Sequence, residues 1–275
     1  MIVRNSGNGI DTGILKLLDM IPAFARCTRN RGLPFIISWA HRLCGVLLVM
    51  FVWFHIYTLS FLTAPGAYAD KMKLYDLPVL AFIEWALALP VIFHALNGGR
   101  LILYESFRFR GDDVLLKWVA GLSLLYAGIL AVLMLMGNQS VSAVFFWLMA
   151  AAAALSAVYG LYARIGRTPH QWSWKLQRIS GAFLLVMVPA HFLFMHLSPQ
   201  AAKDAGQVAL RMQNLWIKLV DMALLASALY HGGHGLIAIL NDYAASKALR
   251  VAGRAAIIVA MMAAAWAGIK LIVLI

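Results

Sequence analysis

One spacing of arginine, glycine, histidine and an acid occurs twice in this chain, and it constrains the fold more than any other feature. The first copy reads Arg42-x2-Gly45-x9-His55 and then Glu84-x9-His94-x3-Gly98; the second reads Arg178-x2-Gly181-x9-His191 and then Asp221-x9-His231-x3-Gly235. Each half therefore carries two histidines on apolar segments. Four such histidines suggest two bis-histidine haems inside a membrane, because two axial imidazoles complete the coordination of a haem iron.

The composition is that of an integral membrane protein. Hydrophobic residues make up 63% of the 275 residues and charged residues only 12%, whereas about a quarter of an ordinary soluble domain is charged. Cys27 and Cys44 are too few for an iron-sulfur cluster, a structural zinc site or covalent haem attachment, so any haem must be bound non-covalently. Most of the excess basic charge lies at span ends, which favours membrane topology over nucleic-acid binding.

Hydropathy and turn signals predict an all-α polytopic bundle of about seven spans. The spans are expected near residues 34-62, 77-106, 114-136, 141-163, 173-197, 214-242 and 249-274. Alternation of these spans groups most of the connecting cations on one side, namely Arg26, Arg29, Arg31, Arg108, Arg110, Arg164, Arg167, Lys247 and Arg250. By the positive-inside rule that side is the cytoplasm. The expected location is therefore the inner (cytoplasmic) membrane, with a cytoplasmic N-terminus and a C-terminus outside.

The repeat divides the chain into two parallel pseudo-repeats that enclose the two haems. Residues 1-33 are expected to form a cytoplasmic segment without a cleavable signal, in which the spacing of apolar residues between Ile10 and Ile21 predicts a helix on the membrane surface. The first membrane repeat spans 34-136 and the second 172-275. Between them, 137-171 supplies a linker helix and loop, since two units of equal orientation can be fused only if one more span returns the chain to the starting side.

Depth decides how the histidines pair. At a rise of about 1.5 Å per residue, His55 and His191 lie roughly 20 Å beyond Arg42 and Arg178 at the inner interface, and they form an outer pair. His94 and His231 sit on spans of opposite direction, roughly 16-18 Å before the inner ends of those spans, and they form an inner pair. Pairing His55 with His94 would tilt a porphyrin across two depths.

Other residues compete for these roles. His196 and His234 are near enough in sequence to serve in place of His191 and His231, although the repeat favours the latter; His41 and His170 near the interface suit a polar or quinone-facing role. Gly45, Gly98, Gly181 and Gly235 are candidates for haem packing, and close helix packing explains any one of them equally well.

These residues resemble a known family, the cytochrome b membrane anchor of succinate:quinone oxidoreductases, meaning succinate dehydrogenase and quinol:fumarate reductase. Ser38, His41, Arg42 and Gly45 look like the first-helix signature of the anchor, and His94-x3-Gly98-x-Arg100 resembles its second-helix haem motif. Gln177, Arg178, Gly181 and His191 resemble the later haem helix of dihaem anchors, and His231-x3-Gly235 with Asp242 and Tyr243 resembles the haem helix and Asp-Tyr pair of the small anchors.

The chain departs from the family pattern in two ways. Single-chain dihaem anchors commonly have five spans rather than seven, and Leu101 replaces the histidine that usually ends the second-helix motif of the two-chain anchors. The extra spans suggest an inserted hairpin or a fusion of two three-span anchors. His55 and His191 still favour two haems over one.

The resemblance implies two haem b, a quinone (menaquinone or ubiquinone), and docking of a flavoprotein subunit and an iron-sulfur subunit on the cytoplasmic face. Succinate itself would not bind this subunit. Ser38, Arg42, Asp242 and Tyr243 match the family's quinone site near the inner interface, while Arg42 and Arg178 are equally candidates for haem propionates. Membrane lipid surrounds the spans, and a higher oligomer is left open.

Two acids lie roughly 15 Å further outward than the inner ligands. Glu84 and Asp221 are candidates for proton transfer at an outer quinone site. The alternative is an interfacial or helix-starting role. For Asp221 this alternative is slightly favoured, whereas for Glu84, which lies deeper, proton transfer is slightly favoured.

Two other functions fit the same residues. One is a dihaem cytochrome b anchor of another quinone-linked enzyme, such as a hydrogenase or a formate dehydrogenase. The other is a haem-free proton-coupled transporter, in which intramembrane histidines and acids relay protons. Haem absorption of the purified protein would separate the transporter from the cytochromes, and co-purifying subunits would separate the two cytochromes.

Overall fold

The structure of the chain is a computed structural model that describes residues 22–109 and 111–275, with side chains from residue 34 onward. All regular elements in this part of the chain are helices. They are α2 (Pro22–Ser60), η1 (Phe61–Thr63), α3 (Pro65–Tyr75), α4 (Pro78–Phe107), α5 (Asp112–Met136), α6 (Ala143–Ile165), α7 (Trp172–Leu197), α8 (Gln200–Lys203), α9 (Ala205–Met212), α10 (Leu215–Tyr243) and α11 (Lys247–Leu274). The predicted all-α class is confirmed.

Seven of these helices are long and apolar enough to cross a membrane, which confirms the predicted number of spans within the described residues. Their bounds are Pro34–Thr63, Pro78–Phe107, Asp112–Met136, Ala143–Ile165, Trp172–Leu197, Leu215–Tyr243 and Lys247–Leu274. One boundary differs from expectation, because α2 continues through Pro34 and starts at Pro22. The predicted surface helix between Ile10 and Ile21 lies entirely outside the described residues.

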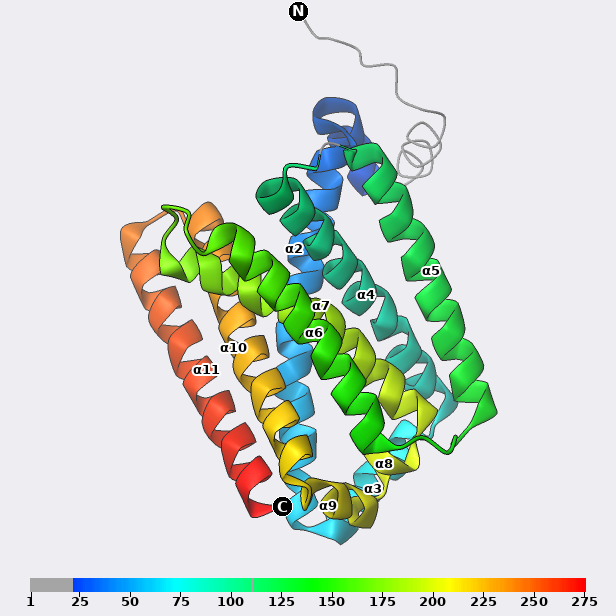
Figure 1. Ribbon diagram of the computed structural model, residues 1–275. Helices are drawn as coiled ribbons and strands as arrows, with labels where there is room; N and C mark the ends of the chain where they lie inside the picture. The colour runs from blue at the N-terminus through cyan, green and yellow to red at the C-terminus, as the bar shows by residue number, and fades with distance from the viewer. Residues whose placement is uncertain (1–21, 110) are drawn as a thin grey trace, which may run out of the picture. The chain divides into compact units, whose positions relative to one another are not determined.

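The chain forms two compact units, Met1–Leu43 and Cys44–Ile275, and α2 contributes to both. In the second unit, α7 packs against α4, α6 and α10, while α5 packs mainly on α4 and α11 on α10 (Figure 1). The helices of the second repeat are α7, α10 and α11. Those of the first are the later part of α2, α4 and α5, and α6 connects the two sets.

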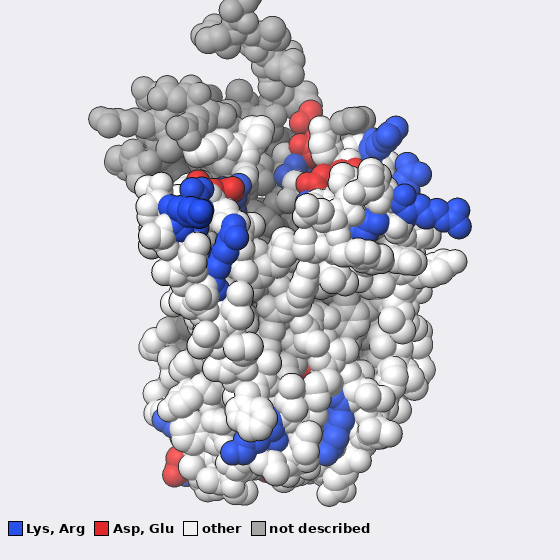
Figure 2. Space-filling model, turned by 90° about the vertical axis from the view of Figure 1, so that its left-hand side faces the viewer, with Lys and Arg blue, Asp and Glu red and all other residues white. Residues whose placement is uncertain are grey.

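The connections of this unit define two ends. We call the end that carries the connections after α4, α6 and α10 the Arg-rich end, and the end with η1, α3, α8 and α9 the cap end. In Figure 2, Lys, Arg, Asp and Glu gather toward the upper and lower ends of the face shown, and the surface between them is almost entirely uncharged. This distribution suits a protein whose middle lies in hydrocarbon and whose ends meet water.

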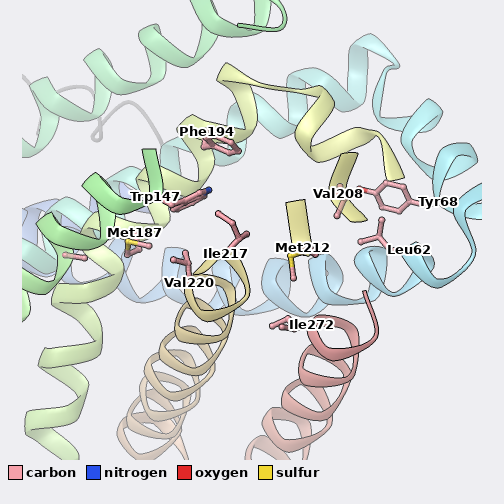
Figure 3. Packing of buried hydrophobic residues seen from close by; sticks show 11 residues of the cluster. Leu62, Tyr68, Trp147, Met187, Phe194, Val208, Met212, Ile217, Val220 and Ile272 are labelled. Carbon is pink, nitrogen blue, oxygen red and sulfur yellow. The ribbon is translucent and has the colours of Figure 1, made fainter. Parts of the chain in front are cut away.

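Short helices close the cap end in both repeats. In the first repeat η1 and α3 join the first span to the second, and in the second repeat α8 and α9 do the same. Figure 3 shows their side chains packed with those of the spans, where Tyr68 lies beside Leu62 and Val208, and Trp147 beside Phe194. The tail of α11 joins the same cluster through Ile272. The cap elements therefore hold the ends of the bundle helices together.

Polar side chains fix several helix starts. Ser142, Asp204, Asn214 and Ser246 each accept a hydrogen bond from a backbone N–H in the first turn of α6, α9, α10 and α11 respectively. Such caps satisfy amides that have no partner within the helix. Asn214, and not Asp221, therefore supplies the helix-starting role at α10.

One buried hydrogen bond links the two caps. The Tyr68 hydroxyl in α3 donates to the carbonyl of Ala202 in α8 at 2.5 Å, and Tyr68 is 1% exposed. Burial raises the pKa of Tyr68 to about 12, so the hydroxyl keeps its donor hydrogen at neutral pH. The bond fixes the first cap against the second.

We expect Tyr68→Phe to destabilise the fold by about 1 kcal/mol, the usual net contribution of one hydrogen bond. The measurement is the thermal midpoint of the detergent-solubilised protein, which should fall by a few degrees. Tyr159→Phe is the matched control, because Tyr159 is 73% exposed and should tolerate the change. An equal midpoint for the Tyr68 variant and the wild type would contradict a stabilising role for the bond.

Candidate functional site

The structure brings together the two histidines that depth assigns to an outer pair. His55 of α2 and His191 of α7 have ring centroids 6.1 Å apart and ring planes at 84°. Both lie roughly one and a half turns before the cap end of their helices. Phe51 stacks on His55 with centroids 5.7 Å apart, and Trp147 of α6 lies 5.9 Å from the His191 ring. Aromatic side chains thus flank the pair on both sides.

The second pair has the same geometry at another level. His94 of α4 and His231 of α10 have ring centroids 6.2 Å apart and ring planes at 89°. They lie roughly 18-20 Å before the Arg-rich end of their helices. Each pair joins the same span of the two repeats, so the pairing follows the internal duplication.

The inner rings rest directly on glycines of the neighbouring span. A Cβ added at Gly45 would lie 3.0 Å from Cε1 of His94, and a Cβ added at Gly181 would lie 3.1 Å from Cε1 of His231. Both contacts join the first span of a repeat to the second. By contrast, a Cβ at Gly235 would meet no atom within 4 Å, so Gly235 leaves open space beside its helix. Gly98 is half-buried on α4.

The carbonyl of Gln177 sets the orientation of the His231 ring. Its oxygen lies 3.3 Å from His231 Nδ1, and the Ser180 hydroxyl lies 3.5 Å from the same nitrogen. Because a carbonyl can only accept, Nδ1 of a neutral His231 carries the proton and Nε2 keeps its lone pair. This is the tautomer that a metal-binding imidazole needs, and such an outer contact orients the ring.

The rings of each pair lie edge-on at close range, with centroids 6.1 and 6.2 Å apart. Among the described residues no group of three or more His, Cys, Asp and Glu side chains is placed to hold a metal. A haem needs only two, since porphyrin supplies the other four ligands.

The competing histidines of the second unit lie in other surroundings. His196 is 6% exposed and packs edge-on against Phe192 at 4.8 Å. His234 stacks on Tyr230 at 6.0 Å, and the exposed His170 lies 4.2 Å from the Trp174 ring. None of the three faces another histidine within the described residues, so the geometry favours His191 and His231.

Arg178 is engaged by a protein carboxylate. Its Nη2 and Nε donate to Oε2 of Glu105 at 2.6 and 3.2 Å, and its guanidinium lies over the Trp174 ring at 4.6 Å. The pair joins α7 to α4 at the Arg-rich end. A haem propionate or a quinone would have to share or displace Glu105 in order to reach this arginine.

The predicted quinone residues near the inner interface belong to both units. Ser38 and Arg42 lie on α2 in the first unit. Asp242 and Tyr243 are the last residues of α10 in the second unit, and both are exposed. Their joint role in binding a quinone stays a prediction.

Glu84 and Asp221 lie in the part of their helices nearest the cap end. Asp221 is close enough to Arg211 of α9 for their charges to interact. Burial lowers the pKa of Arg211, and the negative charge of Asp221 acts in the opposite direction. Lys203, which pairs with Asp76 at 2.8 Å, and Asp76 itself are close enough for their charges to act on Glu84. Both acids thus lie beside charged residues of the cap.

Sequence reasoning missed two contributors to these surroundings. Trp147 looked like a side chain of a helix that only packs, yet it is 1% exposed and covers His191. Arg211 lies in a connection between spans, yet it is near enough to Asp221 for their charges to interact. A single tryptophan in an Ala-rich span, such as Trp147, gives no sequence signal. A basic residue shortly before a span that carries an acid near its start, as Arg211 does before Asp221, gives a weak signal.

Comparison with known proteins agrees with the duplicated geometry. The family model described as succinate dehydrogenase/fumarate reductase transmembrane subunit matches this chain twice, over residues 25–135 and 161–269. The two matches cover most of the chain and leave out most of α6, the connecting helix. The chain therefore contains two copies of the anchor unit.

Individual relatives belong to the same class. The chain is 34% identical over 98 residues to the succinate dehydrogenase 2 membrane subunit SdhC of Mycobacterium tuberculosis, covering 34% of this chain and 71% of that protein. It is 31% identical over 70 residues to the succinate dehydrogenase hydrophobic membrane anchor subunit of Archaeoglobus fulgidus, covering 26% and 60%. No solved structure matches significantly. With two matched anchor units built around facing histidines, the chain belongs to the succinate dehydrogenase/fumarate reductase transmembrane subunit family.

Proposed function

We propose that this chain is the quinone-reactive cytochrome b subunit of a succinate:quinone oxidoreductase and binds two haem b. The observation that carries the proposal is a pair of neighbouring imidazoles at each of two levels, one from each repeat, with centroids 6.1 and 6.2 Å apart. His55 and His191 would hold the outer haem, and His94 and His231 the inner one. Haem iron supplies one-electron chemistry, and two axial imidazoles suit electron transfer because they leave no open position.

The surroundings fit this role. Gly45 and Gly181 allow the His94 and His231 rings to lie against the adjacent span, and Gln177 holds His231 with Nε2 available. Arg42 and Arg178 stay candidates for haem propionates or quinone, and Gly98 and Gly235 for porphyrin packing. The open space beside Gly235 supports the last of these assignments.

The Arg-rich end is the proposed cytoplasmic side of the inner membrane. Its described cations include Arg108, Arg164, Arg167 and Lys247, and the positive-inside rule places such clusters in the cytoplasm. A flavoprotein subunit and an iron-sulfur subunit would dock there and exchange electrons with the inner haem. The C-terminus of this chain would then lie on the outer side of the membrane. The family match favours these partners over those of a hydrogenase or a formate dehydrogenase.

Removing one ligand from each pair tests the two sites separately. We expect His55→Ala and His94→Ala each to abolish a different one of two low-spin haem spectra, because each ring supplies one axial bond. The measurement is haem stoichiometry and redox-resolved absorption of the purified complex. His170→Ala is the control, since His170 is exposed and faces a tryptophan. If neither ligand variant lost haem, the assignment would fail; a wild-type value of one haem would remove the outer site.

The glycine contacts give an independent test of the inner site. In Gly45→Ala the new Cβ would lie 3.0 Å from the His94 ring, so the ring must move by a few tenths of an ångström. We expect altered or several-fold weaker absorption of the inner haem and an unchanged outer haem, with the same outcome for Gly181→Ala. Gly160→Ala is the control, since nothing lies within 4 Å of its added Cβ. An unchanged inner spectrum in both variants would contradict the contact.

Glu84 and Asp221 are the proposed proton donors or acceptors for a quinone near the outer haem, while Ser38, Asp242 and Tyr243 serve a site at the cytoplasmic interface. Quinone chemistry needs protons as well as electrons, and a positioned acid or base typically contributes about 10²-10⁴-fold. The carboxyl groups of both acids lie at the cap end beside charged residues of α8 and α9. Those charged residues offer a connection to the outer water phase.

We expect Glu84→Gln to lower succinate:quinone turnover by at least tenfold while haem content and haem reduction stay normal. The same assay applies to Asp221→Asn, where loss of the negative charge near Arg211 also weakens the cap. Asp70→Asn is the control, because Asp70 pairs with Lys73 in an exposed position of the same end. Normal turnover in both acid variants would place proton transfer elsewhere.

A further inference from the structure

A basic pocket lies at the Arg-rich end, away from the paired histidines. It has a volume of about 460 Å³ and lies between the end of α10 and the start of α11. Its lining consists of Asn241, Lys247, Arg250, Val251 and Arg254. Three of the five residues are cations, and no acid lines the pocket.

The three cations share one face of α11. Their spacing of three and then four residues stacks them on successive helical turns. Arg254 donates from Nε and Nη2 to Oδ1 of Asn241 at 3.2 and 2.7 Å. Among the described residues, no carboxylate pairs with any of the three, and the side chains of Lys247 and Arg250 make no hydrogen bond. The pocket therefore concentrates positive charge that the described part of the chain does not balance.

The position of Arg254 makes this arrangement costly without an anion. It lies about 10 Å along α11 from the Arg-rich end, where a helix is already entering hydrocarbon. Its side chain reaches back to Asn241, near the end of α10, in the way that interfacial arginines snorkel toward water. All three positive groups consequently approach the level of phospholipid headgroups.

The surface beyond the pocket indicates which anion would bind. Further along α11, as far as Ile269, the exposed side chains are apolar, and Ile258, Val259 and Met262 are 50%, 60% and 61% exposed. Among the described elements, α11 packs mainly on α10, at the edge of the bundle. Figure 2, which looks from the side of Figure 1 on which α11 lies, shows basic atoms near the top, a broad uncharged surface below them, and further basic atoms only near the lower end. A ligand suited to both parts has an anionic head and long apolar chains.

We propose that this pocket binds the phosphate of an anionic phospholipid, whose acyl chains lie along α11. Lys247, Arg250 and Arg254 provide the positive charge, and Asn241 fixes the Arg254 guanidinium. Basic pockets between spans on the cytoplasmic side are known to suit such headgroups. Free phosphate offers the same charged group but has no apolar chains to contact the exposed apolar side chains of α11. The proposal requires membrane insertion of the chain and is independent of haem binding.

The test uses the complete complex in nanodiscs that contain phosphatidylcholine with a minor share of phosphatidylglycerol. After detergent extraction, lipid retained per complex is measured by mass spectrometry. We expect wild-type protein to retain at least threefold more phosphatidylglycerol than the Arg250→Gln/Arg254→Gln variant, with equal phosphatidylcholine. The Lys117→Gln/Arg167→Gln variant removes two cations of the same end outside the pocket and should retain wild-type amounts.

Two further arms separate the alternatives. High salt should release phosphatidylglycerol from wild-type protein, because screening weakens phosphate contacts, while inorganic phosphate at millimolar concentration should not. If the charge-conserving Arg250→Lys/Arg254→Lys variant retains the lipid, charge explains binding even where the Gln variant is unstable. Equal phosphatidylglycerol retention in the wild-type and Gln complexes would overturn the proposal. Displacement of phosphatidylglycerol from the wild-type complex by inorganic phosphate alone would also overturn it. The same holds if the Gln variant loses the iron-sulfur subunit while its retention of phosphatidylglycerol is unchanged.

Discussion

The contact between a glycine of one span and an imidazole of the next is the constraint on which the rest of the bundle depends. It occurs twice, as Gly45 against His94 and Gly181 against His231, with nearly equal distances. A larger residue at either glycine would push the ring away, so the contact fixes both the separation of two helices and the direction in which the histidine points. Once both rings are fixed, they face each other across the two repeats.

Duplication in parallel explains why the bundle has a helix outside the repeats. Two three-span units of equal orientation require one more crossing between them, and α6 makes it, largely outside the two regions that match the family model. The helix also acquires a role in the outer site, because Trp147 lies against both His191 and Phe194. The helix that the topology requires therefore also packs against one of the two histidine pairs.

The sequence alone predicted the spans, the all-α class and which histidines meet, since hydropathy and a repeated spacing are local properties that survive folding. Their role as ligands still rests on the proposed function. The sequence did not predict the contacts that depend on how each helix is rotated about its axis or on which backbone groups lie nearby. Any residue carries a carbonyl, so nothing marked Gln177 as the acceptor for His231. Likewise Glu105 facing Arg178, and Arg211 facing Asp221, depend on how separate helices are rotated.

The two histidine pairs are alike in distance but not in their supporting contacts, and this difference has chemical meaning under the proposed function. Nδ1 of His231 has a carbonyl partner, whereas the buried Nδ1 of His191 has none in the described structure. A hydrogen bond from Nδ1 to a carbonyl makes the imidazole a better electron donor through Nε2 and stabilises the more oxidised metal. His191 instead lies against Trp147. A positive charge acts on both pairs, Arg211 on His191 and Arg178 on His231, so it does not distinguish them. Under the proposed function, the carbonyl contact of His231 would therefore be the difference that lowers the potential of the inner site relative to the outer one.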